Sequence, residues 1–167
     1  MKTVDDLRTL PVAELQQLIG DLVGQPFAGA HTSYGDELRV SFGTAPERAS
    51  RWELGTRAAR WVLLGKVGVL CRETDGPKGL SGFQALGAAS VAAIDATRSD
   101  RTLALAFDSG HHFVVMPNKP HRTKDDLDLW ELFSPHGWWL AVRRDGSIEL
   151  IPDEMPLVDR QQRHKAA

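Results

Sequence analysis

The sequence predicts an α+β fold, mostly antiparallel β, with two pseudo-symmetric β-meander halves that are each led by a helix. Three observations predict it: short segments in which apolar and polar residues alternate, turn-forming Gly, Pro, Asp and Ser residues between those segments, and a Trp-Glu-Leu signature that occurs twice. The 167 residues suffice for one domain with its own core. We expect a single domain of two duplicated halves, about 10–72 and 80–151, with a polar C-terminal tail at 153–167.

The first half is predicted to begin with a helix at 11–23. Its apolar residues recur at helical spacing, Pro11 suits the first turn, and Gly24 and Pro26 end the helix. Beyond it the period changes to two, which is typical of half-buried strands. Such strands, which we interpret as one antiparallel meander, are predicted at 38–42, 51–54, 59–64 and 69–72.

The second half follows a segment rich in Gly and Pro, Glu73–Leu80, which we interpret as a linker. A short helix is predicted at 80–86, and Asp108-Ser109-Gly110 is predicted to form a hairpin turn, with the glycine supplying a positive φ. The strands of this half are predicted at 91–97, 102–107, 111–116, 129–133, 138–142 and 148–151.

An internal repeat supports the two halves. A shift of 78 positions places Trp52-Glu53-Leu54 on Trp130-Glu131-Leu132 and also places Trp61 on Trp139. Earlier in the chain the best shift is shorter: 65 positions place 38–42 on 103–107, and 64 place Phe27 on Val91. The change of shift predicts an insertion in the second half, which we assign to the strand at 111–116 and the loop after it.

Composition narrows the classes of partner. The formal net charge is −2, from 20 basic and 22 acidic residues, and no long basic stretch supports nucleic-acid binding. Cys71 is the one cysteine, so an intramolecular disulfide is impossible, and we expect an inert, buried thiol there. The sequence contains neither a signal-peptide pattern nor an apolar run of membrane-spanning length. We therefore expect a soluble, cytoplasmic protein without a membrane partner.

The repeated signature is the first candidate site. The tryptophans at 52, 61, 130 and 139 are interpreted as sheet packing, with an aromatic groove for a flat ligand as the alternative. Glu53 and Glu131 are equivalent under the shift of 78, and a pseudo-two-fold axis would bring them together as a pair of carboxylates. The stronger alternative is that each faces water or pairs with an arginine such as Arg39 or Arg60.

The predicted insertion at 111–128 is the second candidate, because a loop varies without disturbing the core. Its ligand or partner candidates are His111, Lys119, His121 and Arg122. His111 and His112 are adjacent and point to opposite faces of a strand, and no Cys/His set at zinc spacing occurs, so we expect no metal site.

No nucleophile elbow, phosphate-binding loop or dinucleotide fingerprint occurs, so the sequence predicts neither catalytic residues nor a cofactor. The leading hypothesis is a non-enzymatic protein-binding module, of an immunity or regulatory type. The alternative is a small-ligand binder or an enzyme with a groove between the two halves. The oligomeric state is left open.

Two sets of motifs carry a resemblance. The first is Leu22-Val23-Gly24-Gln25-Pro26-Phe27 with Gly35–Gly43 and Trp52-Glu53-Leu54; the second is Leu103-x-Leu105-x-Phe107-x-x-Gly110 with Trp130–Gly137. With these motifs the chain resembles a family of small bacterial proteins of unknown function, some of which are similar to immunity proteins that neutralise bacterial toxins. The resemblance implies a binding role and assigns no functional residue.

Overall fold

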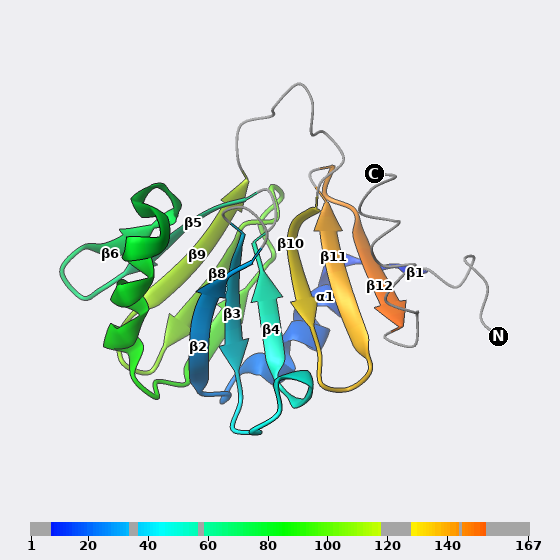
Figure 1. Ribbon diagram of the computed structural model, residues 1–167. Helices are drawn as coiled ribbons and strands as arrows, with labels where there is room; N and C mark the ends of the chain where they lie inside the picture. Colours follow the sequence, from blue (N-terminus) through cyan, green and yellow to red (C-terminus); the bar gives the residue numbers. More distant parts are fainter. Residues whose placement is uncertain (1–7, 34–36, 57–58, 118–127, 144, 153–167) are drawn as a thin grey trace.

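The computed structural model describes residues 8–33, 37–56, 59–117, 128–143 and 145–152 (Figure 1). Within them the fold is α+β, mostly antiparallel β, as the sequence predicts. The helical elements are α1 Val12–Ile19 and the 3-10 helices η2 Gly20–Leu22, η3 Arg48–Ser50 and η4 Glu73–Leu86. The strands are β1 Arg8–Thr9, β2 Phe27–Thr32, β3 Leu38–Phe42, β4 Trp52–Gly55, β5 Ala59–Leu64, β6 Val69–Arg72, β7 Val91–Asp95, β8 Leu103–Phe107, β9 His112–Pro117, β10 Asp128–Phe133, β11 Trp138–Arg143 and β12 Ile148–Pro152.

The strands form a seven-stranded sheet, β1-β12-β11-β10-β4-β3-β2, and a five-stranded sheet, β6-β5-β9-β8-β7. In each sheet a three-strand meander from one half is continued by strands from the other half. β4 pairs with β3 and β10, whereas β5 pairs with β6 and β9. The prediction of one meander over 38–72 is therefore wrong, because the chain crosses from one sheet to the other between β4 and β5.

A local two-fold relation is visible where the two sheets meet. The N–H of Phe27 donates to the carbonyl of Ala89 (2.8 Å), and the N–H of Val91 donates to the carbonyl of Gln25 (3.0 Å). These bonds are reciprocal under the predicted shift of 64 positions, and they flank a bridge between Pro26 and Ser90, which the same shift relates. The meanders β2-β3-β4 and β7-β8-β9 extend from this point as counterparts.

The strand β9 is the counterpart of β4. Phe42 and Phe107, which the shift of 65 relates, stack with ring centroids 6.3 Å apart. β4 pairs with β3 through Leu54 and Val40, as β9 pairs with β8 through Phe113 and Leu105. The prediction that 111–116 forms an additional strand is therefore wrong, since this strand occupies a place that both halves contain.

The shift of 78 positions does not relate equivalent residues. Leu63 of β5 pairs with Phe113 of β9, while Leu132 of β10 pairs with Leu54 of β4. Because Phe113 and Leu54 are counterparts, Leu63 corresponds to Leu132, a shift of 69 positions. The same shift places Trp61 on Trp130, so the predicted match of Trp61 with Trp139 is wrong.

The segment interpreted as a linker lies within η4. This helix is kinked at Gly76, whose φ of 67° suits glycine, and it continues to Leu86, so the short helix predicted at 80–86 is its second part. Gly82 is required where η4 packs on β6, since a Cβ there would lie 2.8 Å from the Sγ of Cys71. Glycine therefore serves close packing here.

Both sheets and α1 share one core. Leu15 and Ile19 of α1 are fully buried in it, and the core includes side chains from both sheets. Gln16 of the same helix covers an edge of β7: its amide nitrogen donates to the carbonyl of Ile94 (2.6 Å), and its amide oxygen accepts from the N–H of Ala96 (3.1 Å). The predicted tail at 153–167 lies outside the described residues.

Candidate functional site

Glu53 and Glu131 lie on the face of the seven-stranded sheet that is turned away from the shared core. Glu131 opposes Gly55 and Glu53 opposes Phe133 across the β4–β10 pairing, so the two carboxylates are diagonal neighbours on one face. Their exposed fractions are 9% for Glu53 and 0% for Glu131. The prediction that they could face water is wrong, because each lies in the buried part of this face.

Arg39 organises the charges around Glu53. Its guanidinium nitrogens lie 3.0 Å from a carboxylate oxygen of Glu37 and 3.0 Å from one of Glu53. The guanidinium carbon also lies 5.2 Å from the ring centroid of Phe133. The pairing of Glu53 with Arg39, one of the predicted alternatives, is thus present. In a buried cluster of this kind each charge depends on its partner, because removal of one partner would leave the other charge buried and uncompensated.

The tryptophans of the signature are packing residues. Trp61 contacts Phe83 and Phe113, with ring centroids 5.7 and 6.1 Å away. Trp130 is 1% exposed and donates its indole N–H to the carbonyl of Arg101 (2.9 Å). Trp139 stacks on Phe133 on the opposite face of the sheet, at 5.3 Å. The interpretation as packing is therefore favoured over an aromatic groove.

The groove predicted between the two halves is filled where their meanders meet. The stacked rings of Phe42 and Phe107 occupy this place, and both side chains are buried. Neither Glu53 nor Glu131 lines it, since both are on the other face of the sheet. At this contact, therefore, packed phenyl rings stand where the predicted groove would open, and the small-ligand alternative stays a prediction.

Of the histidine and loop candidates predicted at 111–128, the structure describes His111 but not the other three. The Nδ1 atom of His111 lies 2.7 Å from the Oγ of Ser109, and the neighbouring His112 is exposed. Lys119, His121 and Arg122 lie outside the described residues. Among the residues that the structure does describe, no group of three or more His, Cys, Asp or Glu side chains is placed to hold a metal ion.

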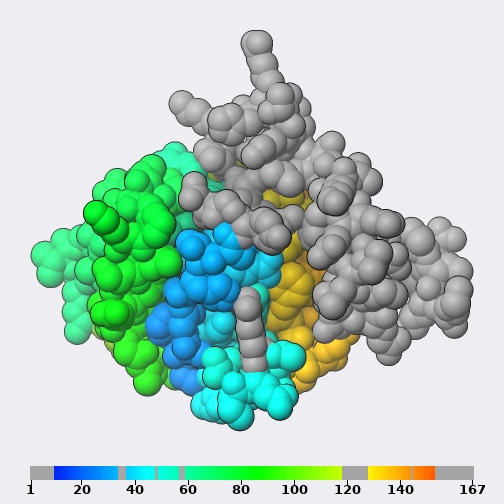
Figure 2. Space-filling model, viewed as in Figure 1, coloured from blue at the N-terminus to red at the C-terminus, as the bar shows by residue number. Residues whose placement is uncertain are grey.

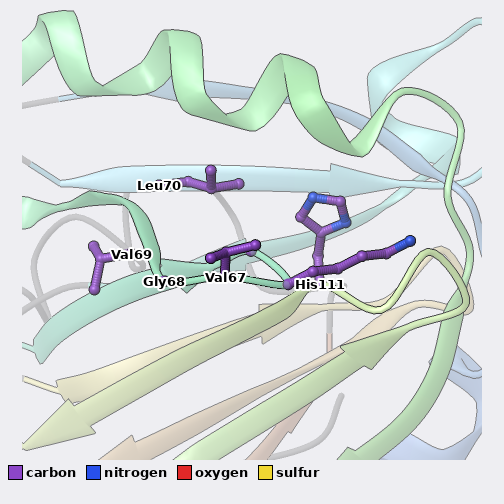
Figure 3. A pocket seen from close by; sticks show the side chains of 7 residues that line it. Val67, Gly68, Val69, Leu70 and His111 are labelled. Carbon is purple, nitrogen blue, oxygen red and sulfur yellow. The ribbon is translucent and has the colours of Figure 1, made fainter.

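A hollow lies where the β5–β6 hairpin approaches His111 (Figure 3). Its volume is about 570 Å³, and it is lined by His111 and the hairpin residues Gly65, Lys66, Val67, Gly68, Val69 and Leu70. The side chain of Lys66 runs over Gly110: a Cβ at that glycine would lie 3.2 Å from the Cε atom of Lys66. His111 is thus the predicted candidate that the structure brings into a concave site.

The hairpin exposes apolar side chains around this hollow. Val67 is fully exposed, and the exposed fractions of Val69 and Leu70 are 45% and 42%. The hairpin projects from the end of the five-stranded sheet (Figure 1) and forms a protrusion at the left of the molecular surface (Figure 2). Sequence reasoning treated these residues as a turn and a strand; the apolar Val67 between two turn glycines was the signal that could have marked them.

The thiol of Cys71, on β6 of this hairpin, is a poor nucleophile. Cys71 is 1% exposed, and its burial, together with the nearby carboxylate of Asp75, raises its pKa from 9.0 to about 11. The thiol therefore stays protonated at neutral pH, which disfavours a nucleophilic role. The prediction of a buried cysteine is confirmed.

No protein-family description, curated protein or solved structure matches the chain. Within its described residues, the chain has no helix that is both long and apolar enough to span a membrane.

Proposed function

We propose that the chain is a non-enzymatic protein-binding module, of an immunity or regulatory type, which contacts its partner through the β5–β6 hairpin. The observation that carries the proposal is the exposure of Val67, Val69 and Leu70 together on one projecting element. Contiguous exposed apolar side chains around a concave surface are typical of protein interaction sites.

The energetics of these side chains support binding. Full burial of an exposed Val or Leu side chain contributes roughly 1.5–3 kcal/mol. Val67 is fully exposed, whereas Val69 and Leu70 are 45% and 42% exposed, so a partner that covers all three gains one such contribution from Val67 and roughly half of one from each of the others.

The hairpin is also preorganised. β5 pairs with both β6 and β9, and Cys71 of β6 is buried under η4. A surface that is already ordered loses little conformational entropy when a partner binds. This rigidity supports a role for the hairpin as a binding surface.

The proposal is tested by site-specific photo-crosslinking in the native host. A benzophenone amino acid replaces Val67 in the full chain, and the matched control carries it at Val23, another exposed apolar residue at 44% exposure. We expect a defined protein adduct from position 67 that is absent from position 23. Leu70→Asp, placed in the same chain, should reduce the adduct at least fivefold. Equal adducts from both positions, or none from position 67, would refute the proposal.

A further inference from the structure

The two halves contain equivalent hairpins whose surroundings differ. The shift of 69 positions that relates β5 to β10 also relates β6 to β11, since Cys71 pairs with Leu63 as Leu140 pairs with Leu132. The turn between β5 and β6 therefore corresponds to the turn between β10 and β11, and Gly68 corresponds to Gly137.

The residue that faces each turn also has a counterpart. Trp52 pairs with Phe42, and the N–H of Phe107 donates to the carbonyl of His111 (2.9 Å). Because Phe42 and Phe107 are equivalent, Trp52 and His111 occupy equivalent places, one beside each turn. The hollow at the β5–β6 turn is therefore the place that Trp52 occupies at the β10–β11 turn.

The indole of Trp52 shows what the shared geometry accommodates. Its ring packs edge-on against Trp138 at 5.5 Å and against His136 at 5.8 Å, and Trp52 is only 2% exposed. At the equivalent positions of the other turn the chain has Val69 and Val67, with the smaller His111 in place of Trp52. The second turn thus keeps apolar walls but lacks the large ring that fills the first.

The charge beside the hollow adds a polar requirement. Lys66 lines the hollow, and among the described residues its ammonium group forms no ion pair. A carboxylate adjacent to an inserted ring would find this cation as its partner. His111, whose Nδ1 atom lies 2.7 Å from the Oγ of Ser109, lines the hollow beside the hairpin (Figure 3).

We infer that the hollow receives an aromatic side chain flanked by a carboxylate, supplied by the partner protein. The inserted ring would take the place that Trp52 takes in the other half, against Val67, Val69 and His111, while the carboxylate pairs with Lys66. The inference rests on the proposed function, because it names the chemistry of the partner at the same hairpin.

The experiment uses N-acetyl-tryptophan as the probe, with the full chain observed through the amide chemical shifts of residues 65–70. We expect N-acetyl-tryptophan to shift these amides, and N-acetyl-leucine, which keeps the carboxylate but lacks the ring, to bind at least threefold more weakly. N-acetyl-tryptophanamide, which lacks the carboxylate, should bind about two- to fivefold more weakly than the acid, as expected for an exposed ion pair. Lys66→Gln should remove that difference.

His111→Trp is the decisive variant, since it places beside the β5–β6 turn the same large ring that Trp52 places beside the β10–β11 turn. We expect at least tenfold weaker binding of N-acetyl-tryptophan, with the dispersed spectrum of a folded chain. Val67→Ser serves as a second variant, because a fully exposed side chain is not needed for folding, and it should weaken the probe about two- to fivefold. Unchanged binding in both variants, or equal binding of the tryptophan and leucine probes, would overturn the inference.

The results also separate this inference from the proposed function. If position 67 crosslinks to a protein but the tryptophan probe does not bind, the inference of an aromatic occupant is refuted and the protein-binding role of the hairpin stands. Binding of the probe without any crosslinked partner would retain the pocket and refute the protein-binding role.

Discussion

The β10–β11 hairpin and the β5–β6 hairpin hold equivalent places, yet one is closed and the other open. At the first, Trp52 packs into the turn, and β11 is flanked by a further strand, β12. At the second, His111 lies beside the turn, β6 ends its sheet, and Val67 is fully exposed. Of two hairpins in equivalent places, one thus has a buried tryptophan beside its turn, and the other exposes apolar side chains, which we propose as the contact for a partner.

The largest expected effect contrasts a core tryptophan with the open hairpin. Trp130→Ala removes a 1% exposed ring and its hydrogen bond to the carbonyl of Arg101, so we expect a loss of about 3–5 kcal/mol in the free energy of unfolding. Val67→Ala should change it by less than about 0.5 kcal/mol. Urea denaturation of both variants measures the contrast. Comparable losses in the free energy of unfolding would mean that the side chain of Val67 contributes to the stability of the fold.

The next prediction concerns a substitution that should open the β10–β11 hairpin. Trp52→His places at the β10–β11 turn the residue that faces the β5–β6 turn, and we expect a loss of about 2–4 kcal/mol because a buried ring leaves a cavity. N-acetyl-tryptophan should then shift the amides of residues 136–138, which it leaves unchanged in the original chain. A stability loss without new shifts would argue that the two turns are not interchangeable.

Sequence patterns revealed the two-fold correspondence only where equivalent strands of the two halves bury similar residues. Phe42 and Phe107 correspond as predicted, because both continue an alternating strand into the contact between the sheets. The Trp-Glu-Leu signature misled for a physical reason: β4 and β10 are neighbours in one sheet, so each places Trp and Leu on the same core face. The two Trp-Glu-Leu segments thus have similar patterns of burial, although they do not hold equivalent places in the two halves.

The open hollow was beyond prediction from the sequence. Alternation indicates which residues of a strand share a face, but it does not indicate that β5 leaves the sheet that contains β4. The neighbours of the β5–β6 turn, His111 among them, follow from that crossing. The ion pair between Glu53 and Arg39 could be anticipated, since both residues lie off the core face of adjacent predicted strands.

A third effect compares two arginines on the same sheet. Arg39 has a side-chain exposure of 17% and pairs with Glu37 and Glu53, so Arg39→Met leaves buried carboxylates without that partner, and we expect a loss of about 2–3 kcal/mol. Arg143 is 43% exposed and pairs with Asp128 and Glu149, so Arg143→Met should cost less than about 1 kcal/mol. Thermal denaturation at low salt compares the two losses of stability. A larger loss for Arg143→Met would contradict the conclusion that Arg39 forms the more strongly coupled, buried cluster.

The last effect appears only at alkaline pH and lies on β6, where Cys71 holds the place that Leu140 holds on β11. Folding raises the pKa of this thiol from 9.0 to about 11, so the folded chain binds its proton more tightly than the unfolded chain does. The resulting stabilisation is complete below pH 9 and disappears as the pH rises to about 11. Cys71→Ala lacks this titrating group, while every other group is shared, so the difference in unfolding free energy between the two chains isolates the thiol.

We therefore expect the difference in unfolding free energy between the original chain and Cys71→Ala to be constant up to pH 9. Between pH 9 and 11 the original chain should lose stability relative to the variant. Alkylation by iodoacetamide should follow the same pH window, because the reactive thiolate forms only there or upon opening of the hairpin. Rapid alkylation at pH 8 would show that η4 leaves β6 readily, and the β5–β6 hairpin would then be a mobile element instead of the rigid counterpart of β10–β11.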